Sequence, residues 1–168
     1  GKLTAAQNAK LKKAQEEALF ARLKEALDVG DYRKAVRLQD RAAAMSGEYA
    51  AKAKELLNRK FTALLSAADK ALREKRYDEA IRLAQSALVL KPESQAAHGK
   101  LTAAQGAKRI SFLWRRLREV VAERKWADAR RVAAQILKLQ NDNSTAKQVV
   151  DFQWAKYLVQ QKVLHRHR

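Results

Sequence analysis

The sequence predicts an all-α protein with about seven helices that alternate between long and short. Three observations support this prediction. Alanine, leucine, lysine, arginine and glutamine dominate the 168 residues, and only one proline and five glycines interrupt them. Apolar residues recur at the spacing of a helix and not with the alternation of a strand. The same order of apolar positions and helix ends also occurs three times along the chain.

The repeated unit is clearest between residues 73 and 94. A turn around Lys75-Arg76 leads to the aromatic residue Tyr77, and a short amphipathic segment follows. Pro92 ends that segment because proline lacks the amide hydrogen that a helix interior needs. This order predicts a helix, a tight turn and a second, shorter helix.

Shifts of 45 and then 49 residues align three copies of this unit, as from Tyr32 to Tyr77 and from Tyr77 to Trp126. The alignment matches the alanines three residues after each aromatic (Ala35, Ala80, Ala129) and the helix ends (Gly47, Pro92, Asn141). The recurrence of an aromatic residue at each turn leads us to expect that these rings pack between the two helices of each pair.

These residues resemble the tetratricopeptide repeat (TPR) family, above all the segment 77–81, Ala87-Leu88 and Pro92. The resemblance covers residues 16–141 and implies a TPR-like, right-handed solenoid of helical hairpins. The period of that family is about 34 residues. The present periods are longer by amounts close to three and four helical turns of about 3.6 residues, so we expect lengthened helices.

We expect long helices at about 3–29, 48–74 and 94–123, and short helices at about 32–45, 77–90 and 127–140. A last helix at about 144–165 would cap the repeats. Together these elements predict a single TPR-like domain over residues 1–168, with repeat units at about 3–47, 48–92 and 93–141.

The charge of the chain favours anionic partners. Its 36 basic and 18 acidic residues give a formal net charge of +18. The absence of cysteine excludes disulfides and thiolate metal sites. No nucleophile, base and orienting group can be assembled from the sequence, so we expect no enzymatic activity, no cofactor and no metal.

No apolar run approaches the roughly 20 residues of a membrane span, and the first residues lack the pattern of a signal peptide. We therefore expect a cytoplasmic protein, unless the chain is an excised part of a larger or exported one. Self-association through the terminal helices is a further expectation, because the ends of short solenoids expose apolar surface.

Two surfaces are candidate binding sites. The first is a basic cluster in the third unit, where positions seven residues apart share a helix face around Phe112; it comprises Lys108, Arg109, Arg115, Arg116, Arg124, Arg130 and Arg131. The second is the concave groove that the TPR resemblance implies, with Phe20, Lys24, Leu65, Trp114 and Arg118. For Phe112 and for the groove, ordinary packing within the helices is the competing interpretation.

The sequence favours a non-enzymatic scaffold or adaptor that binds an acidic protein surface or an acidic peptide. The alternative is a nucleic-acid-associated protein, such as an RNA or ribonucleoprotein component, that contacts phosphates without reading the bases. Charge geometry distinguishes the two. One continuous basic stripe would favour nucleic acid, and basic residues around an apolar groove would favour protein.

Overall fold

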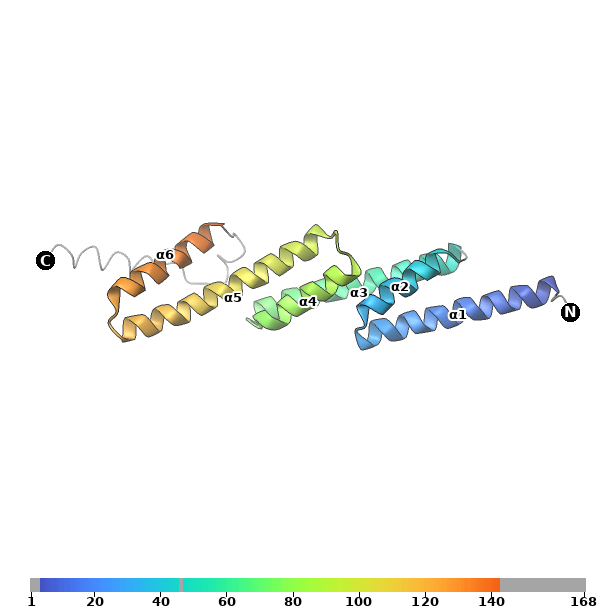
Figure 1. Ribbon diagram of the computed structural model, residues 1–168, viewed down its shortest axis with the longest axis horizontal. Coiled ribbons are helices and arrows are strands. Elements are labelled where there is room, and N and C mark those ends of the chain that lie inside the picture. The colour runs from blue at the N-terminus through green and yellow to red at the C-terminus, as the bar shows by residue number, and fades with distance from the viewer. Residues whose placement is uncertain (1–3, 46, 143–168) are drawn as a thin grey trace. The chain divides into compact units, whose positions relative to one another are not determined.

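The structure, a computed structural model, describes residues 4–45 and 47–142 and is helical throughout that part of the chain, with no strand (Figure 1). The long helices are α1 (Ala5–Val29), α3 (Gly47–Arg73) and α5 (Gln95–Ala122). The short helices are α2 (Tyr32–Ala43), α4 (Tyr77–Leu90) and α6 (Trp126–Asp142). The predicted all-α class and the alternation of long and short helices are confirmed.

The number of helices differs from the prediction. Six helices are described where the sequence predicted seven, and the predicted capping helix at 144–165 lies outside the described residues. Every predicted helix within the described part forms. Gly99 and Gly106 do not interrupt α5, which continues through both positions.

One backbone arrangement reverses the chain at all three turns that join a long helix to a short one. The amides of Asp31, Arg76 and Lys125 donate to the carbonyls five residues earlier, at 2.9, 2.8 and 2.8 Å. The residue before each donor has a left-handed backbone: φ is 81° at Gly30, 60° at Lys75 and 56° at Arg124. This combination is the Schellman ending of a helix. The positions follow the 45- and 49-residue shifts, so the backbone repeats in the register of the sequence.

The same three residues also begin the short helices. Their carbonyls accept the first hydrogen bonds of the short helices at 3.0 Å, and the donors are the amides of Ala35, Ala80 and Ala129. Asp31 adds a side-chain cap, because its carboxylate accepts the amide of Lys34 at 3.0 Å. Arginine and lysine side chains have no acceptor atom with which to provide such a cap. The first short helix therefore has a stabilising bond that the other two lack.

The chain divides into two compact units, one of Gly1–Ala68 with Arg82–His98 and one of Asp69–Ile81 with Gly99–Arg168. In the first unit, α1 packs against α2 over a core that includes Leu23, Ala26 and Leu38. In the second, α5 and α6 share a core that includes Leu117 and Ile136. None of the described helices combines the length and hydropathy that a membrane span requires.

Burial confirms the register of the repeat. The aligned positions in the last turns of the long helices are all buried (Leu23, Ala68 and Leu117; Ala26, Ala71 and Val120), as are the alanines that open the short helices (Ala35, Ala80 and Ala129). Alanine at this last position leaves room for the two helices of a hairpin to approach closely. The repeat therefore reflects packing requirements and not composition alone.

Glycine is expected to stabilise the two turns that lack it. Lys75→Gly and Arg124→Gly should each raise the free energy of unfolding by about 0.5–1 kcal/mol, because glycine adopts a left-handed backbone without steric cost. Gly30→Ala should lower it by about 1 kcal/mol for the converse reason. Urea unfolding followed by circular dichroism measures all three changes.

Lys54→Gly is the matched control, since Lys54 lies in the interior of α3. A glycine there should destabilise the protein by about 1 kcal/mol. Destabilisation by Lys75→Gly and Arg124→Gly as well would contradict the role assigned to the left-handed residues.

Candidate functional site

The predicted basic cluster is exposed at all seven positions, but the hairpin of α5 and α6 spreads its members over different faces. Residues two apart on a helix project about 200° from each other. Arg115 therefore points away from Leu117, and Arg131 points away from Ala133. Leu117 and Ala133 belong to one core between the two helices. Arg115 and Arg131 thus lie on opposite sides of the hairpin.

Ion pairs divide the cluster further. Lys108 bonds Asp78 at 2.5 Å, Arg116 bonds Glu119 at 3.4 Å and Arg131 bonds Asp128 at 2.5 Å. The other four members, which are Arg109, Arg115, Arg124 and Arg130, make no ion pair within the described residues. Among the described residues, only these four members of the predicted cluster can therefore bind an external anion without losing an ion pair.

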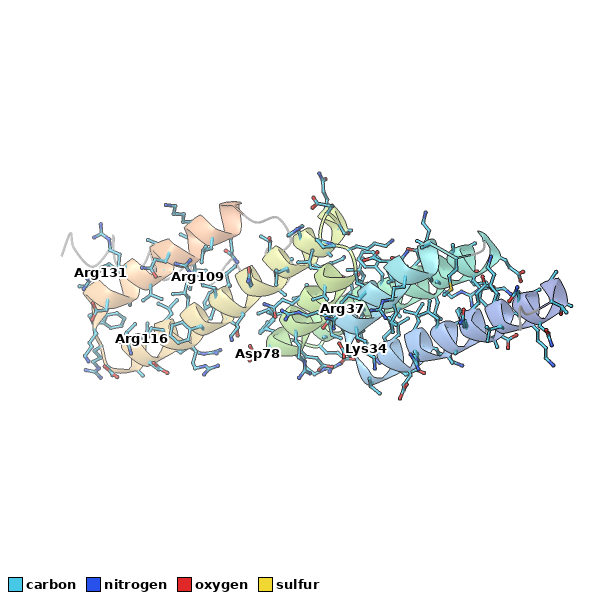
Figure 2. All side chains as sticks on the ribbon, turned by 45° about the vertical axis from the view of Figure 1, so that its right-hand side comes forward. Lys34, Arg37, Asp78, Arg109, Arg116 and Arg131 are labelled. Atoms are coloured by element: carbon cyan, nitrogen blue, oxygen red, sulfur yellow. The ribbon has the colours of Figure 1, made fainter. Side chains whose placement is uncertain are left out.

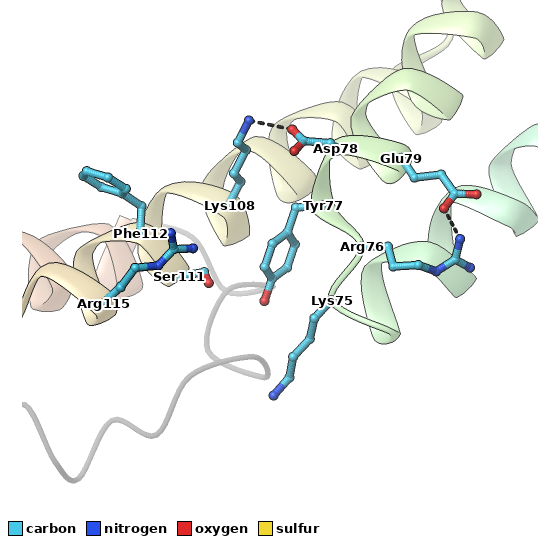
Figure 3. Close-up of a pocket in the computed structure, with 9 residues that line it drawn as sticks. All are labelled: Lys75, Arg76, Tyr77, Asp78, Glu79, Lys108, Ser111, Phe112 and Arg115. Carbon is cyan, nitrogen blue, oxygen red and sulfur yellow. Dashed lines mark hydrogen bonds and ion pairs between the residues drawn. The ribbon is translucent and has the colours of Figure 1, made fainter. Parts of the chain in front are cut away.

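One part of the cluster surrounds a hollow of about 530 Å³ in the second unit (Figure 3). We call it the Phe112 hollow. Its lining consists of Lys75 and Arg76 from the turn before α4, residues 77–79 from the start of α4, and Lys108, Ser111, Phe112 and Arg115 from α5. Phe112 is 60% exposed, which is unusual for a ring on a helix whose other large apolar residues are mostly covered. The hollow thus combines an accessible aromatic face with basic side chains.

Four cations line the Phe112 hollow, and two of them form ion pairs with carboxylates of the chain. Arg76 bonds Glu74 and Glu79, and Lys108 bonds Asp78, as Figure 3 shows for Glu79 and Asp78. Lys75 and Arg115 make no ion pair in the part of the chain that the structure describes. The pair of Lys108 and Asp78 is largely exposed to water and so contributes little to stability. Lys108 can therefore turn to a ligand at small cost.

Tyr77 connects the turn to α5. Its phenol has a pKa raised above the ordinary value by partial burial, and a hydrogen bond with Ser111 opposes that shift. The corresponding residue of the first hairpin, Tyr32, lies 6.0 Å from the Lys60 ammonium of α3. The aromatic residues of the first two turns thus also reach the next long helix, in addition to the packing expected within each helix pair. Trp126, at the third turn, remains 45% exposed.

The predicted groove residues are divided between packing and exposure. Leu65 packs against the core of the first unit and Trp114 against that of the second, and Phe20 is half-buried. Lys24 and Arg118 are exposed. These placements agree with the competing interpretation for Leu65 and Trp114, and the groove itself stays a prediction.

Sequence reasoning did not assign six of the residues that line the Phe112 hollow to a site: Lys75, Arg76, Tyr77, Asp78, Glu79 and Ser111. Lys108 contacts Asp78 across a separation of 30 residues, and Ser111 contacts Tyr77 across a similar one. No local sequence pattern predicts such contacts. The hydroxyl of Ser111 three residues after Lys108, on the same side of the helix, was the only available signal.

Phe112 is expected to contribute little to folding. Phe112→Ala should change the free energy of unfolding by less than about 1 kcal/mol, because most of the ring is already in water. Leu117→Ala, five residues further along α5 and fully buried, should cost about 2–5 kcal/mol. Denaturant unfolding of both variants compares them. Equal losses would show that Phe112 is a packing residue after all.

Tyr77 is expected to titrate above the ordinary tyrosine value. Its neutral form is favoured in the folded state, so its contribution to stability is present at neutral pH and is lost as the pH rises through the raised pKa. The difference in absorbance at 295 nm between the native chain and Tyr77→Phe isolates this titration. Ser111→Ala should move the midpoint higher, and a midpoint that falls would contradict the hydrogen bond.

Comparison with protein-family models, with curated proteins and with solved structures finds no match to this chain. The TPR resemblance therefore depends on the residues that carry it and on the three-fold register of turns and buried positions. The single TPR-like domain and the solenoid stay predictions. The chemistry of the exposed surface is the remaining guide to function.

Proposed function

We propose that this chain is a non-enzymatic scaffold or adaptor that binds an acidic polypeptide, with the Phe112 hollow as one contact site. The observation that carries this proposal is the exposed Phe112 ring beside two cations, Lys75 and Arg115, that make no ion pair within the described residues. Aromatic residues and arginine are the types enriched where proteins bind one another. An acidic peptide supplies carboxylates for the cations and an apolar side chain for the ring.

Charge placement favours protein over nucleic acid as the partner. A phosphate backbone is best followed by a continuous line of cations. Within the second unit, the cations lie on opposite sides of the hairpin of α5 and α6, and three of the seven cluster residues are neutralised by acidic neighbours. One specific observation supports the alternative, since an exposed ring beside arginine can also stack a base of single-stranded nucleic acid.

Binding to a fluorescent peptide of alternating glutamate and leucine, measured by anisotropy, tests the proposal. Arg115→Glu and Lys75→Glu should each weaken binding about tenfold, because each removes a charge-assisted contact and adds repulsion. Phe112→Ala should weaken it several-fold, while the free energy of unfolding changes by less than about 1 kcal/mol. The matched control is Lys138→Glu, an exposed lysine of α6 outside the hollow with the same change in net charge.

Equal losses in Lys138→Glu and Lys75→Glu would show that only the net charge attracts the peptide. A single-stranded oligonucleotide in the same assay tests the alternative that the Phe112 hollow binds nucleic acid. Tighter binding of the oligonucleotide than of the peptide at equal salt, lost in Phe112→Ala, would assign the hollow to nucleic acid.

A further inference from the structure

A second hollow, of about 480 Å³, lies between α1 and α2 in the first unit, and its lining carries a large excess of positive charge. We call it the first-hairpin hollow. Leu38, which is only 7% exposed, is its apolar member. The charged members are four cations and one carboxylate: Arg22, Lys34, Arg37, Arg41 and Glu25. Their formal sum is +3, which is the largest cationic excess around any hollow described here.

The three cations of α2 share one face of the helix. Lys34, Arg37 and Arg41 are separated by three and four residues, the spacing at which helix side chains are neighbours (Figure 2 labels Lys34 and Arg37). Like charges at this spacing repel each other and destabilise the helix. No ion pair within residues 4–45 and 47–142 relieves any of the three. The repulsion among the three cations therefore costs stability, and no ion pair within the described residues offsets it.

The repeat provides an internal comparison. In the third hairpin, the positions of Arg22, Glu25 and Arg37 keep their charges as Arg116, Glu119 and Arg131. The position of Lys34 becomes Asp128, and that of Arg41 becomes Gln135. There Arg131 bonds Asp128 at 2.5 Å and Arg116 bonds Glu119 at 3.4 Å, so the same five positions carry no net charge. Folding of the hairpin thus does not require the cationic set.

We propose that the first-hairpin hollow is a binding site for a phosphate monoester. A phosphate monoester carries about −1.5 to −2 charges and three strong acceptor oxygens in one compact group. The planar guanidinium forks of three arginines match those oxygens in pairs. A single carboxylate would leave most of the +3 charge unmatched. The phosphodiesters of nucleic acid bring only one charge each and need a longer track of cations than this short hollow offers.

This site is independent of the function proposed above, because it uses other residues in the other unit. Its ligand has two sources with the same chemistry, a phosphorylated side chain on a polypeptide and a free phosphate ester. The probes are therefore a phosphoserine peptide, the same peptide with serine, and free phosphoserine, each titrated into the full chain by calorimetry.

The phosphoserine peptide should bind at least about tenfold more tightly than the serine peptide, the effect of adding charge-assisted hydrogen bonds. Free phosphoserine should compete if the phosphate alone is recognised, and weak competition would assign the site to phosphorylated polypeptides. Lys34→Asp should abolish the preference for phosphate by rebuilding the ion pair of the third hairpin. An acidic residue in the first turn suits the helix dipole, so this variant should remain folded.

The control is Lys54→Asp, which makes the same change of charge at an exposed lysine of α3 outside the hollow. It should keep the preference for phosphate. The double variant Asp128→Lys with Gln135→Arg should raise the number of phosphate sites from one to two. Equal binding of the phosphoserine and serine peptides, or a preference that survives Lys34→Asp, would overturn the proposal.

Discussion

The turn between the long and the short helix of each hairpin is the constraint on which the rest of the structure depends. A hydrogen bond across five residues and one left-handed residue fix the angle at which the chain reverses. The residue that donates this bond also accepts the first hydrogen bond of the next helix. The end of the long helix and the start of the short one therefore share a single residue. The alanines at 35, 80 and 129 then meet the long helices at a fixed place. The cores of both units and the positions of the charged side chains follow from this geometry.

Local sequence features predicted most of the fold because the forces that set it are local. Apolar spacing located all six described helices, and the alignment of Tyr32, Tyr77 and Trp126 located the turns. The left-handed backbone at Lys75 and Arg124 could not be foreseen, since neither residue type favours it. At those positions the packing of the two helices overrides the preference of the residue, whereas Gly30 satisfies both.

The candidate sites were less predictable for a different reason. The seven-residue spacing correctly placed Lys108 and Arg115 on one face, and both line the same hollow as Phe112. Spacing along one helix could not reveal that Arg131 lies on the other side of the hairpin. The net charge of the whole chain also gave no sign of the cationic set in the first hairpin, because a sum of charges does not distinguish paired from unpaired cations. The positions of the carboxylates determine which arginines form internal ion pairs and which can bind a partner.

The turns also differ in their susceptibility to cleavage. Trypsin cuts after lysine and arginine, but most of the 36 basic residues lie in helices, whose backbone does not fit the extended conformation that a protease requires. The turn residues Lys75, Arg76, Arg124 and Lys125 are all exposed and lie outside the helices, whereas the first turn carries Gly30 and Asp31 in their place. The second and third hairpins therefore present dibasic bonds at their tips, and the first hairpin is protected by the sequence of its turn.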